Sequence, residues 1–587
     1  MKRLHVILAI ALLAVTVGAG WWSVRLWRRQ QLVATALAAV PPLPNLVRWP
    51  ADMVTAVQTT TAAAGRAKDP LPPLGRLAAI YHVNGFAAEA KQVLGALREM
   101  EPHTARWAYL LADLYLRAGD AAGAEPALRA TVELAPDYVP AWIRLGDLYL
   151  GREDLARAEE SYARAAREAP GNVRAEFALI SFEAWHGRRG DPRRSLTDLV
   201  RANPGIKELH DLLARIEAAA GDESRAAEER KLAAAAVQHI ETRDPWIDEL
   251  ASFCFDPNRL GLMAYKLGRE RRLIEAETLL KRAILLGPGD TTLRQALSEL
   301  YEKMERLTDA RAVLESAVKD CPDDPKMPEL LSRVLCLEHK PDDAVTVVTR
   351  ALARWPGNAS LHAALGYALR DGRRNTEAIA ALREAVRLDP SLVEAHYNLG
   401  FCLLAHGERE AARAEAEQAV SMRPNYPEAL VLLGSLAIEA GDVATAERHI
   451  TRLYALQPDE PGSRLLYAAL HLIKGTAADK AGHLDEAAEL FQAGLQASPN
   501  LGPLLRESGS VAMRRGAFAD AVELLRRYVR IEPADATAFA WLGEALVETD
   551  HPADARKILE QGKLLAQKAG NQAQVDEFTL LLQRTRR

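Results

Sequence analysis

The sequence predicts an all-α fold in which pairs of short helices stack into a solenoid. Two observations support this prediction. A 34-residue unit recurs five times in phase between residues 291 and 458, and each copy has the pattern of a helix, a turn and a second helix. The composition is rich in Ala, Leu, Arg and Glu and holds only 6% aromatic residues, which suits an all-helical body. A fixed period of this size is typical of helical solenoids, whose units contact mainly their neighbours.

Three features mark the unit, and each has a packing reason. A proline ends the second helix at a fixed place, since proline cannot continue a helix; these prolines are Pro322, Pro356, Pro390, Pro424 and Pro458. A leucine followed by Ser or Gly marks the crossing of the two helices; these leucines are Leu297, Leu331, Leu365, Leu399 and Leu433. Thirteen residues later an alanine allows close approach of the second helix; these are Ala310, Ala344, Ala378, Ala412 and Ala446. This spacing resembles the tetratricopeptide repeat (TPR) family, and the resemblance implies a groove lined by the first helices.

Residues 1–29 are predicted to form an N-terminal transmembrane or signal-anchor helix. Lys2 and Arg3 precede a run from Leu4 to Val24 that contains no Asp, Glu, Lys or Arg. A run of this length, at about 1.5 Å rise per residue, can cross a hydrocarbon core of roughly 30 Å. Tryptophans and arginines follow at its far end, as at a membrane interface. A cleaved signal peptide is the alternative interpretation.

Residues 30–70 are predicted to be a proline-containing linker. Prolines at positions 41, 42, 44 and 50 interrupt regular structure, and those at 70, 72 and 73 mark the start of the repeats. We expect a semi-rigid stalk here.

The repeats are predicted to begin at residue 71, with units 1 to 5 in residues 71–240. In the fourth unit Pro192 replaces the consensus alanine, which predicts a short second helix from about Arg193 to Arg201. In the fifth, Gln238 stands where the closing proline is due, which predicts a second helix that continues past Ile240.

Residues 241–256 are predicted to be an irregular insertion, the largest break in the array. Units 6 to 14 are expected in residues 257–570 and a capping helix in residues 571–587, for about 14 units in all. The interval from Pro458 to Pro499 is seven residues longer than the repeat. Seven residues are about two helical turns, so a longer first helix can absorb them.

The resemblance to TPR proteins implies that positions 2, 5, 9 and 12 of each first helix face the groove. Many of these positions hold aromatic or charged residues, which suit binding of an extended peptide or a partner helix. Ile143 and Asp147 also fall on such positions. The candidate partner-binding residues are Tyr109, Asp113, Phe177, Tyr265, Arg333, Tyr367, Arg370, Tyr397 and Phe401. The group Tyr367, Arg370, Tyr397 and Phe401 is the strongest candidate.

The sequence contains no motif of a reaction centre. It has no H-E-x-x-H, G-x-S-x-G or G-x-x-x-x-G-K-[ST] pattern. Its four cysteines lie far apart without a C-x-x-C, and its net charge of −5 gives no basic face for nucleic acid. We therefore expect no enzyme activity, no cofactor, no metal and no nucleic-acid partner. Histidines that share the consensus Trp position are expected to pack rather than bind metal; these are His210, His362, His396 and His471.

These features together predict a non-enzymatic protein–protein interaction scaffold. We expect a membrane-tethered TPR array of the bacterial cell envelope that serves envelope assembly, secretion or polysaccharide export. The expected location is the bacterial inner membrane, single-pass, with the repeats outside the cytoplasm. The alternatives are a cytoplasmic, membrane-anchored adaptor that regulates an envelope biosynthesis enzyme, an exported chain with a cleaved signal, and a TPR-containing transferase subunit. The sequence leaves the oligomeric state open.

Overall fold

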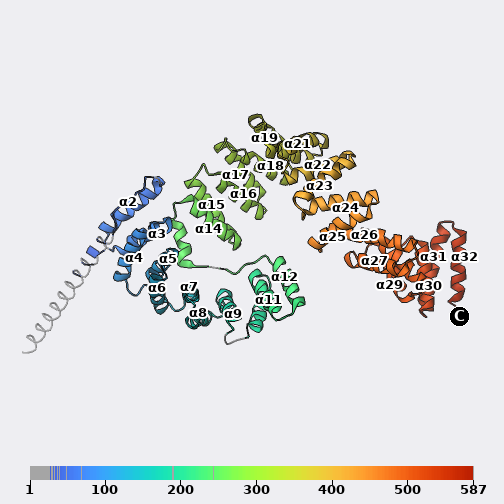
Figure 1. Cartoon of the computed structure of the whole chain (residues 1–587), viewed down its shortest axis with the longest axis horizontal. Helices are drawn as coiled ribbons and strands as arrows, with labels where there is room; N and C mark the ends of the chain where they lie inside the picture. The colour runs from blue at the N-terminus through green and yellow to red at the C-terminus, as the bar shows by residue number, and fades with distance from the viewer. Residues whose placement is uncertain are drawn as a thin grey trace, which may run out of the picture. The chain divides into compact units, whose positions relative to one another are not determined.

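The computed structural model is an array of helices (Figure 1). It describes residues 40–585 apart from 48, 68, 188–190 and 242, together with 27, 31, 34, 35 and 38. Within this part of the chain the only β-type pairing is an isolated bridge between Ile206 and Gln238. The chain forms two compact halves that divide between Met327 and Pro328, and each half is described by itself.

The first half consists of successive helix hairpins and one irregular segment. Its elements are α2 (Ala51–Arg66), α3 (Leu71–Asn84), α4 (Ala87–Met100), α5 (Ala105–Arg117), α6 (Ala121–Leu134), α7 (Val139–Leu150), α8 (Leu155–Glu168), α9 (Val173–His186), α10 (Pro192–Ala202), α11 (Lys207–Ala219), α12 (Glu223–Ala235), α13 (Pro245–Asp248), the 3-10 helix η1 (Glu249–Phe253), α14 (Pro257–Arg269), α15 (Leu273–Leu286), α16 (Thr291–Lys303) and α17 (Leu307–Asp320). Each first helix packs on the second helix of its own repeat, and the second helices α4, α6, α8, α10 and α15 also pack on the first helix of the next repeat.

The second half continues the hairpins without an irregular segment of that kind in its described residues. Its helices are α18 (Lys326–Leu337), which begins just before the division, α19 (Pro341–Arg354), α20 (Ala359–Asp371), α21 (Asn375–Leu388), α22 (Val393–His406), α23 (Arg409–Met422), α24 (Pro427–Ala440), α25 (Val443–Leu456), α26 (Pro461–Lys480), α27 (Leu484–Ala497), α28 (Gly502–Arg514), α29 (Phe518–Ile531), α30 (Ala536–Glu548), α31 (Pro552–Lys568) and α32 (Gln572–Arg584).

Several second helices begin at an aspartate that caps them. The side chains of Asp120, Asp154, Asp222 and Asp442 each accept a hydrogen bond from the backbone N–H three residues later, at 2.9–3.2 Å. Such a cap satisfies a backbone donor that has no partner inside the helix, and it favours negative charge at the helix start. The turn residues of the repeat thus fix where these helices begin.

The small residue at the helix crossing has the predicted packing role. A Cβ atom added to Gly366 would lie 2.4 Å from Leu382 Cγ, and one added to Gly434 would lie 2.7 Å from Ile450 Cγ1. A Cβ on Gly543 would meet Leu559 Cδ2 at 2.2 Å. In each case the obstructing side chain belongs to the second helix of the same repeat. The two helices cross at a distance that only a residue without a side chain allows.

The consensus Trp position has a hydrogen-bonding role that explains its replacements. Trp142 Nε1 donates to the carbonyl of Pro136 at 2.8 Å, and His362 Nε2 lies 2.9 Å from the carbonyl of Pro356. The same contact, always six residues back, is made by His210 (3.0 Å), His396 (3.0 Å) and Arg294 (2.9 Å). His471 differs, because α26 is continuous there and the carbonyl six residues back lies inside the helix. It packs against Tyr467 instead, with ring centroids 4.4 Å apart.

Two irregular helices were predicted correctly, and one was not. Helix α10 is short at 11 residues, and α26 has 20 residues and absorbs the long interval after Pro458. The prediction that the second helix of the fifth repeat continues past Ile240 is wrong, because α12 ends at Ala235. Beyond it, Gln238 exchanges backbone hydrogen bonds with Gly205 and Lys207, each at 3.0 Å. This pairing starts an extended segment in place of the helix.

The predicted linker also needs correction, because residues 51–66 form helix α2, which packs on α3. Its buried residues are Met53, Val57, Thr60 and Ala64. Their spacing of four, three and four residues places them on one face of a helix. The sequence pattern did not indicate this helix, because prolines flank it and its buried face includes threonine and alanine.

The predicted single-pass location in the inner membrane is contradicted. None of the described helices is both long and apolar enough to span a membrane, which takes about 20 consecutive apolar residues. Even the longest, α26, carries Arg464, Lys474, Asp479 and Lys480. The segment predicted as an anchor, residues 1–29, lies outside the described residues apart from Trp27, which is exposed.

Candidate partner-binding groove

We use the word groove for the face lined by positions 2, 5, 9 and 12 of the first helices. In the first half, part of this face is covered by the chain itself. After α12 the chain runs back toward α3 and α5 (Figure 1), and α13 and η1 pack against these two helices. Residues 243–255 therefore lie against the first helices of repeats 1 to 3, and we call them the inserted segment.

Asp244 is the most strongly held residue of the inserted segment. Its carboxylate accepts hydrogen bonds from the hydroxyls of Tyr109 and Tyr138, both at 2.6 Å, and from Arg144 at 3.0 Å. The Asp244 side chain is buried. Hydrogen bonds to a buried carboxylate are stronger than those between neutral groups, because the donors compensate for its lost hydration. This part of the groove therefore binds a carboxylate through three donors, Tyr109, Tyr138 and Arg144.

Trp246 fills the neighbouring space with an aromatic ring. Its indole is stacked on Tyr138, with centroids 3.7 Å apart and planes 13° apart, and it meets Tyr109 edge-on at 5.5 Å. Its backbone N–H donates to the Tyr138 hydroxyl at 3.2 Å. Stacked and edge-on aromatic contacts are favourable beyond the area that they bury.

The backbone of the inserted segment is bound as well. The side-chain amide of Asn84 donates to the carbonyl of Phe253 at 2.9 Å and accepts from the N–H of Phe255 at 2.7 Å. Arg106 forms an ion pair with Glu249 at 3.0 Å. A side-chain amide that pairs with both backbone groups holds a peptide whatever its side chains are.

Asp113, close to the Asp244 site, is surrounded by two arginines and a histidine. It forms contacts with Arg144 (2.6 Å), Arg117 (2.6 Å) and His82 (3.1 Å). Burial alone would raise the pKa of the Asp113 carboxyl, but the hydrogen bond from His82 and the charges of Arg117 and Arg144 lower it. Arg144 bridges Asp113 to Asp244, so the two carboxylates share one guanidinium.

Of the predicted groove residues, Tyr109 and Asp113 thus lie together, but neither is exposed. Tyr109 is fully buried, and burial together with its hydrogen bond to Asp244 raises the pKa of its hydroxyl, although Arg144 acts in the opposite direction. Tyr109 binds the inserted segment directly, and Asp113 binds Arg144, which in turn binds Asp244.

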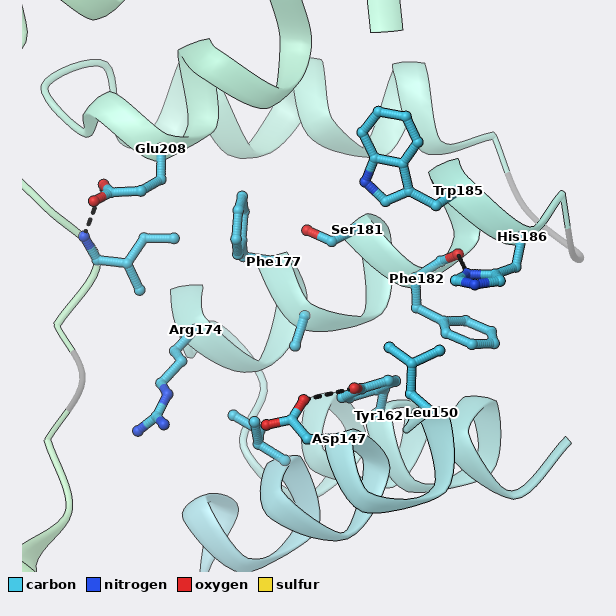
Figure 2. Close-up of a pocket in the computed structure, with 13 residues that line it drawn as sticks. Asp147, Leu150, Tyr162, Arg174, Phe177, Ser181, Phe182, Trp185, His186 and Glu208 are labelled. Carbon is cyan, nitrogen blue, oxygen red and sulfur yellow. Dashed lines mark hydrogen bonds between the residues drawn. The ribbon is translucent and has the colours of Figure 1, made fainter. Parts of the chain in front are cut away.

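Beyond the inserted segment the groove of the first half is open. A pocket of about 440 Å³ lies between α7, α9 and α11 (Figure 2). We call it the Phe177 pocket after the predicted residue on its wall. Its other walls include Ile143, Tyr162, Phe182, Trp185 and Ile240. Its polar lining includes Asp147, Ser181, Arg174 and His186. Glu208 also lines the pocket and accepts a hydrogen bond from the N–H of Ile240 at 3.2 Å.

A second open pocket, of about 340 Å³, lies in the second half between α18, α20 and α22. We call it the Tyr367 pocket. Arg333 and Cys336 line it from α18, and Glu394 lines it from α22. Burial raises the pKa of the Cys336 thiol to about 11, so at neutral pH it is a neutral packing group rather than a nucleophile.

The predicted cluster beside the Tyr367 pocket is assembled as expected from the spacing. The Arg370 guanidinium lies over the rings of Tyr367 and Phe401, at 5.1 and 5.7 Å, and donates to Asp371 at 3.0 Å and to Asn398. Phe401 is 43% exposed and lies 6.4 Å from Tyr397. Tyr265 of α14, by contrast, is 69% exposed and lines none of the described pockets.

Several residues of this face were not singled out from the sequence. They are Asn84, Tyr138 and Arg144, which bind the inserted segment, and Asp244 and Trp246, which are bound. Their partners lie far along the chain; Tyr109 and Asp244 are separated by 135 residues. The sequence signal for this contact was the Asp-Pro-Trp stretch in the insertion, together with tyrosines at groove positions of the repeats.

An array of helix hairpins that holds a peptide segment against its first helices defines a helical-repeat scaffold for protein interaction. Family models agree with this class. Models of the tetratricopeptide repeat match residues 81–139, 109–173 and 394–461, and residues 269–334 and 512–575; a further TPR repeat model matches residues 366–407. The chain is a tetratricopeptide repeat protein.

Several solved structures are similar to this chain at low sequence identity. One is the APC/C hetero-tetramer Cut9–Hcn1, at 16% identity and a TM-score of 0.28, with 82% of this chain and 96% of that chain covered. PilF of Pseudomonas aeruginosa has 21% identity and a TM-score of 0.31, with 37% and 97% covered. YrrB, described as a TPR protein with an unusual peptide-binding site, has 21% identity and a TM-score of 0.24, with 30% and 91% covered. A comparison with curated proteins found no match.

Proposed function

We propose that this protein is a non-enzymatic scaffold that binds extended or helical segments of partner proteins in the groove of its first helices. One observation carries the proposal. The groove of the first half already holds a peptide, because the inserted segment lies in it with its carboxylate, its indole and its backbone all bound. These are the contacts by which a groove recognises a peptide from another chain.

The open stretches are where a partner segment binds. The Phe177 pocket follows the inserted segment along the same face, and the Tyr367 pocket provides an equivalent stretch in the second half. The Phe177 pocket has several aromatic residues in its walls, the Tyr367 pocket has one, and both contain charged groups. Aromatic side chains supply large contact area at little entropic cost, so they are effective anchors for a partner. We assign Phe177, Tyr367, Arg370, Tyr397 and Phe401 to partner binding, with Arg333 at the pocket wall.

Site-specific photocrosslinking tests this function. A photoreactive phenylalanine analogue is placed at Phe177, at Tyr367 or, as a control, at Leu285, which is 81% exposed on the second helix α15. In cells that make the protein, the groove positions should yield discrete crosslinked partners that the control position does not. Equal products from all three positions, or none from the groove positions, would contradict the proposal.

The narrower roles suggested by the sequence, in envelope assembly, secretion or polysaccharide export, remain predictions. The partners identified by crosslinking decide among them. An adaptor for an envelope biosynthesis enzyme would yield that enzyme as the crosslinked product.

A further inference from the structure

Asp147 lies in the Phe177 pocket and is the equivalent of Asp113 in the next repeat. The two carboxylates have opposite environments. Asp113 contacts Arg144, Arg117 and His82. The positions that correspond to these three side chains, one repeat later in each case, hold Ala178, Gly151 and Leu116. Asp113 is therefore contacted by two arginines and a histidine, and none of these three has a counterpart beside Asp147.

The contacts of Asp147 confirm this difference. Its Oδ1 atom accepts a hydrogen bond from the Tyr162 hydroxyl at 2.6 Å (Figure 2), and the described residues form no ion pair with it. Arg174, which also lines the pocket, instead donates to the carbonyl of Arg243 in the inserted segment, at 3.5 Å. Asp147 is an exposed residue at the pocket, in contrast to the buried Asp113. The pocket walls still desolvate its carboxyl in part and raise its pKa, and the Tyr162 hydrogen bond and the charges of Arg174 and Arg144 offset only part of this rise.

A second polar group in the pocket, the Ser181 hydroxyl, has no hydrogen bond within the described part of the chain. Ser181 occupies the position of Asp147 in the next repeat, and its hydroxyl is buried. Figure 2 shows it directed into the pocket, between Phe177 and Trp185. Most buried hydroxyls are hydrogen-bonded, so the Ser181 hydroxyl has its bonding capacity available to a group that enters the pocket.

We propose that the Phe177 pocket takes a lysine or arginine side chain of an extended partner segment, with its cation at Asp147 and Ser181. The aliphatic stem of such a residue packs along Ile143 and Phe177, because long basic side chains bury their methylenes and keep the charged end at a polar group. Ile240, three residues before the inserted segment, lines the pocket, so the pocket adjoins the part of the groove that this segment occupies. This inference rests on the proposed function and adds the chemistry of the partner.

The test is a selection of peptides from a random library displayed on phage, with the full-length chain as bait. Peptides that no longer bind a Phe177→Ala chain are kept, since these use the pocket. We expect them to share a lysine or arginine at one position. Replacing that residue by methionine should weaken binding to the natural chain about tenfold. The same replacement should change binding to an Asp147→Asn chain less than about twofold.

The variants are matched so that a folding defect is not mistaken for a binding effect. Asparagine at position 147 keeps an oxygen that accepts the Tyr162 hydrogen bond. Asp198→Asn removes a negative charge from α10, where the carboxylate is exposed and pairs with Arg201, and should behave as the natural chain does. Phe177-dependent peptides without a shared basic residue, or a methionine penalty that is unchanged in Asp147→Asn, would overturn this inference and leave the proposed function standing. If no Phe177-dependent peptide is selected, the proposed function fails at this stretch, and the inference fails with it.

Discussion

The ring of Tyr138 lies flat against the indole of Trp246, with centroids 3.7 Å apart, although 108 residues separate them in the sequence. Tyr138 belongs to the turn before a first helix, and Trp246 belongs to a segment outside the repeat pattern. Their contact closes part of the groove with the chain's own peptide.

Trp246→Ala should loosen the inserted segment. The substitution removes the stacked contact with Tyr138 and the edge contact with Tyr109, which we expect to cost about 2 kcal/mol for a half-buried indole. Hydrogen exchange of residues 236–256 measures this loss as a lower free energy of opening. Trp185→Ala is the matched control, because Trp185 is 56% exposed and should cost less than about 1 kcal/mol.

Asp244→Ala should be more damaging than its size suggests. It leaves Tyr109 and Tyr138 without their acceptor and leaves Arg144 with only Asp113 as a buried partner. Removing one member of a buried charged network costs about 3 kcal/mol or more. Urea unfolding followed by circular dichroism should show this loss as a lower midpoint for the first half, while Asp198→Ala stays within about 0.5 kcal/mol of the natural chain. Equal stabilities for the two variants would exclude a structural role for the Asp244 site.

Gly366→Ala should destabilise the repeat that contains it. The new methyl group would lie 2.4 Å from Leu382 Cγ, so α20 and α21 would have to separate, at a cost of about 1–3 kcal/mol. Gly268 of α14 is the control, since a Cβ there meets nothing within 4 Å. Gly268→Ala should stabilise its helix by about 0.5–1 kcal/mol, because alanine loses less backbone entropy on folding. Thermal unfolding of both variants would show shifts of opposite sign.

His396 should make the stability of its repeat depend on pH. Its hydrogen bond with Glu415, at 2.6 Å, raises the pKa of the imidazole, and burial opposes this rise. A histidine whose folded pKa lies above the unfolded value of about 6.5 contributes its full stabilisation below that pH and loses it as the pH rises through the folded pKa. His396→Gln should therefore cost more stability at pH 6 than at pH 9, as read by hydrogen exchange of α22 and α23. A cost that grows with pH would contradict this sign.

The sequence predicted those features that depend on the position of a residue within the repeat. The crossing glycines, the short α10 and the long α26 follow from residues that the repeat pattern places, or fails to place, at packing positions. The pattern also placed Phe177, Tyr367 and Arg370 on or beside pocket walls, because the face of a first helix is determined by its position in the unit.

Features outside the period were missed for the same reason. Half of the buried stripe of helix α2 is threonine and alanine, so it carries little hydrophobic signal. The inserted segment binds partners far away in the sequence, and no local rule connects Asp244 to Tyr109. The sequence therefore predicts the groove but not the inserted segment that fills part of it.

The most direct test of the account is hydrogen exchange of the inserted segment in the full-length chain. If the groove of the first half holds this segment as a bound peptide, amides in residues 245–255 should be protected to a degree similar to those of α5, and Asp244→Ala should speed exchange in both places. Exchange of residues 245–255 at the rate of an unstructured peptide, with α5 unaffected by the substitution, would contradict the claim that this face binds peptides.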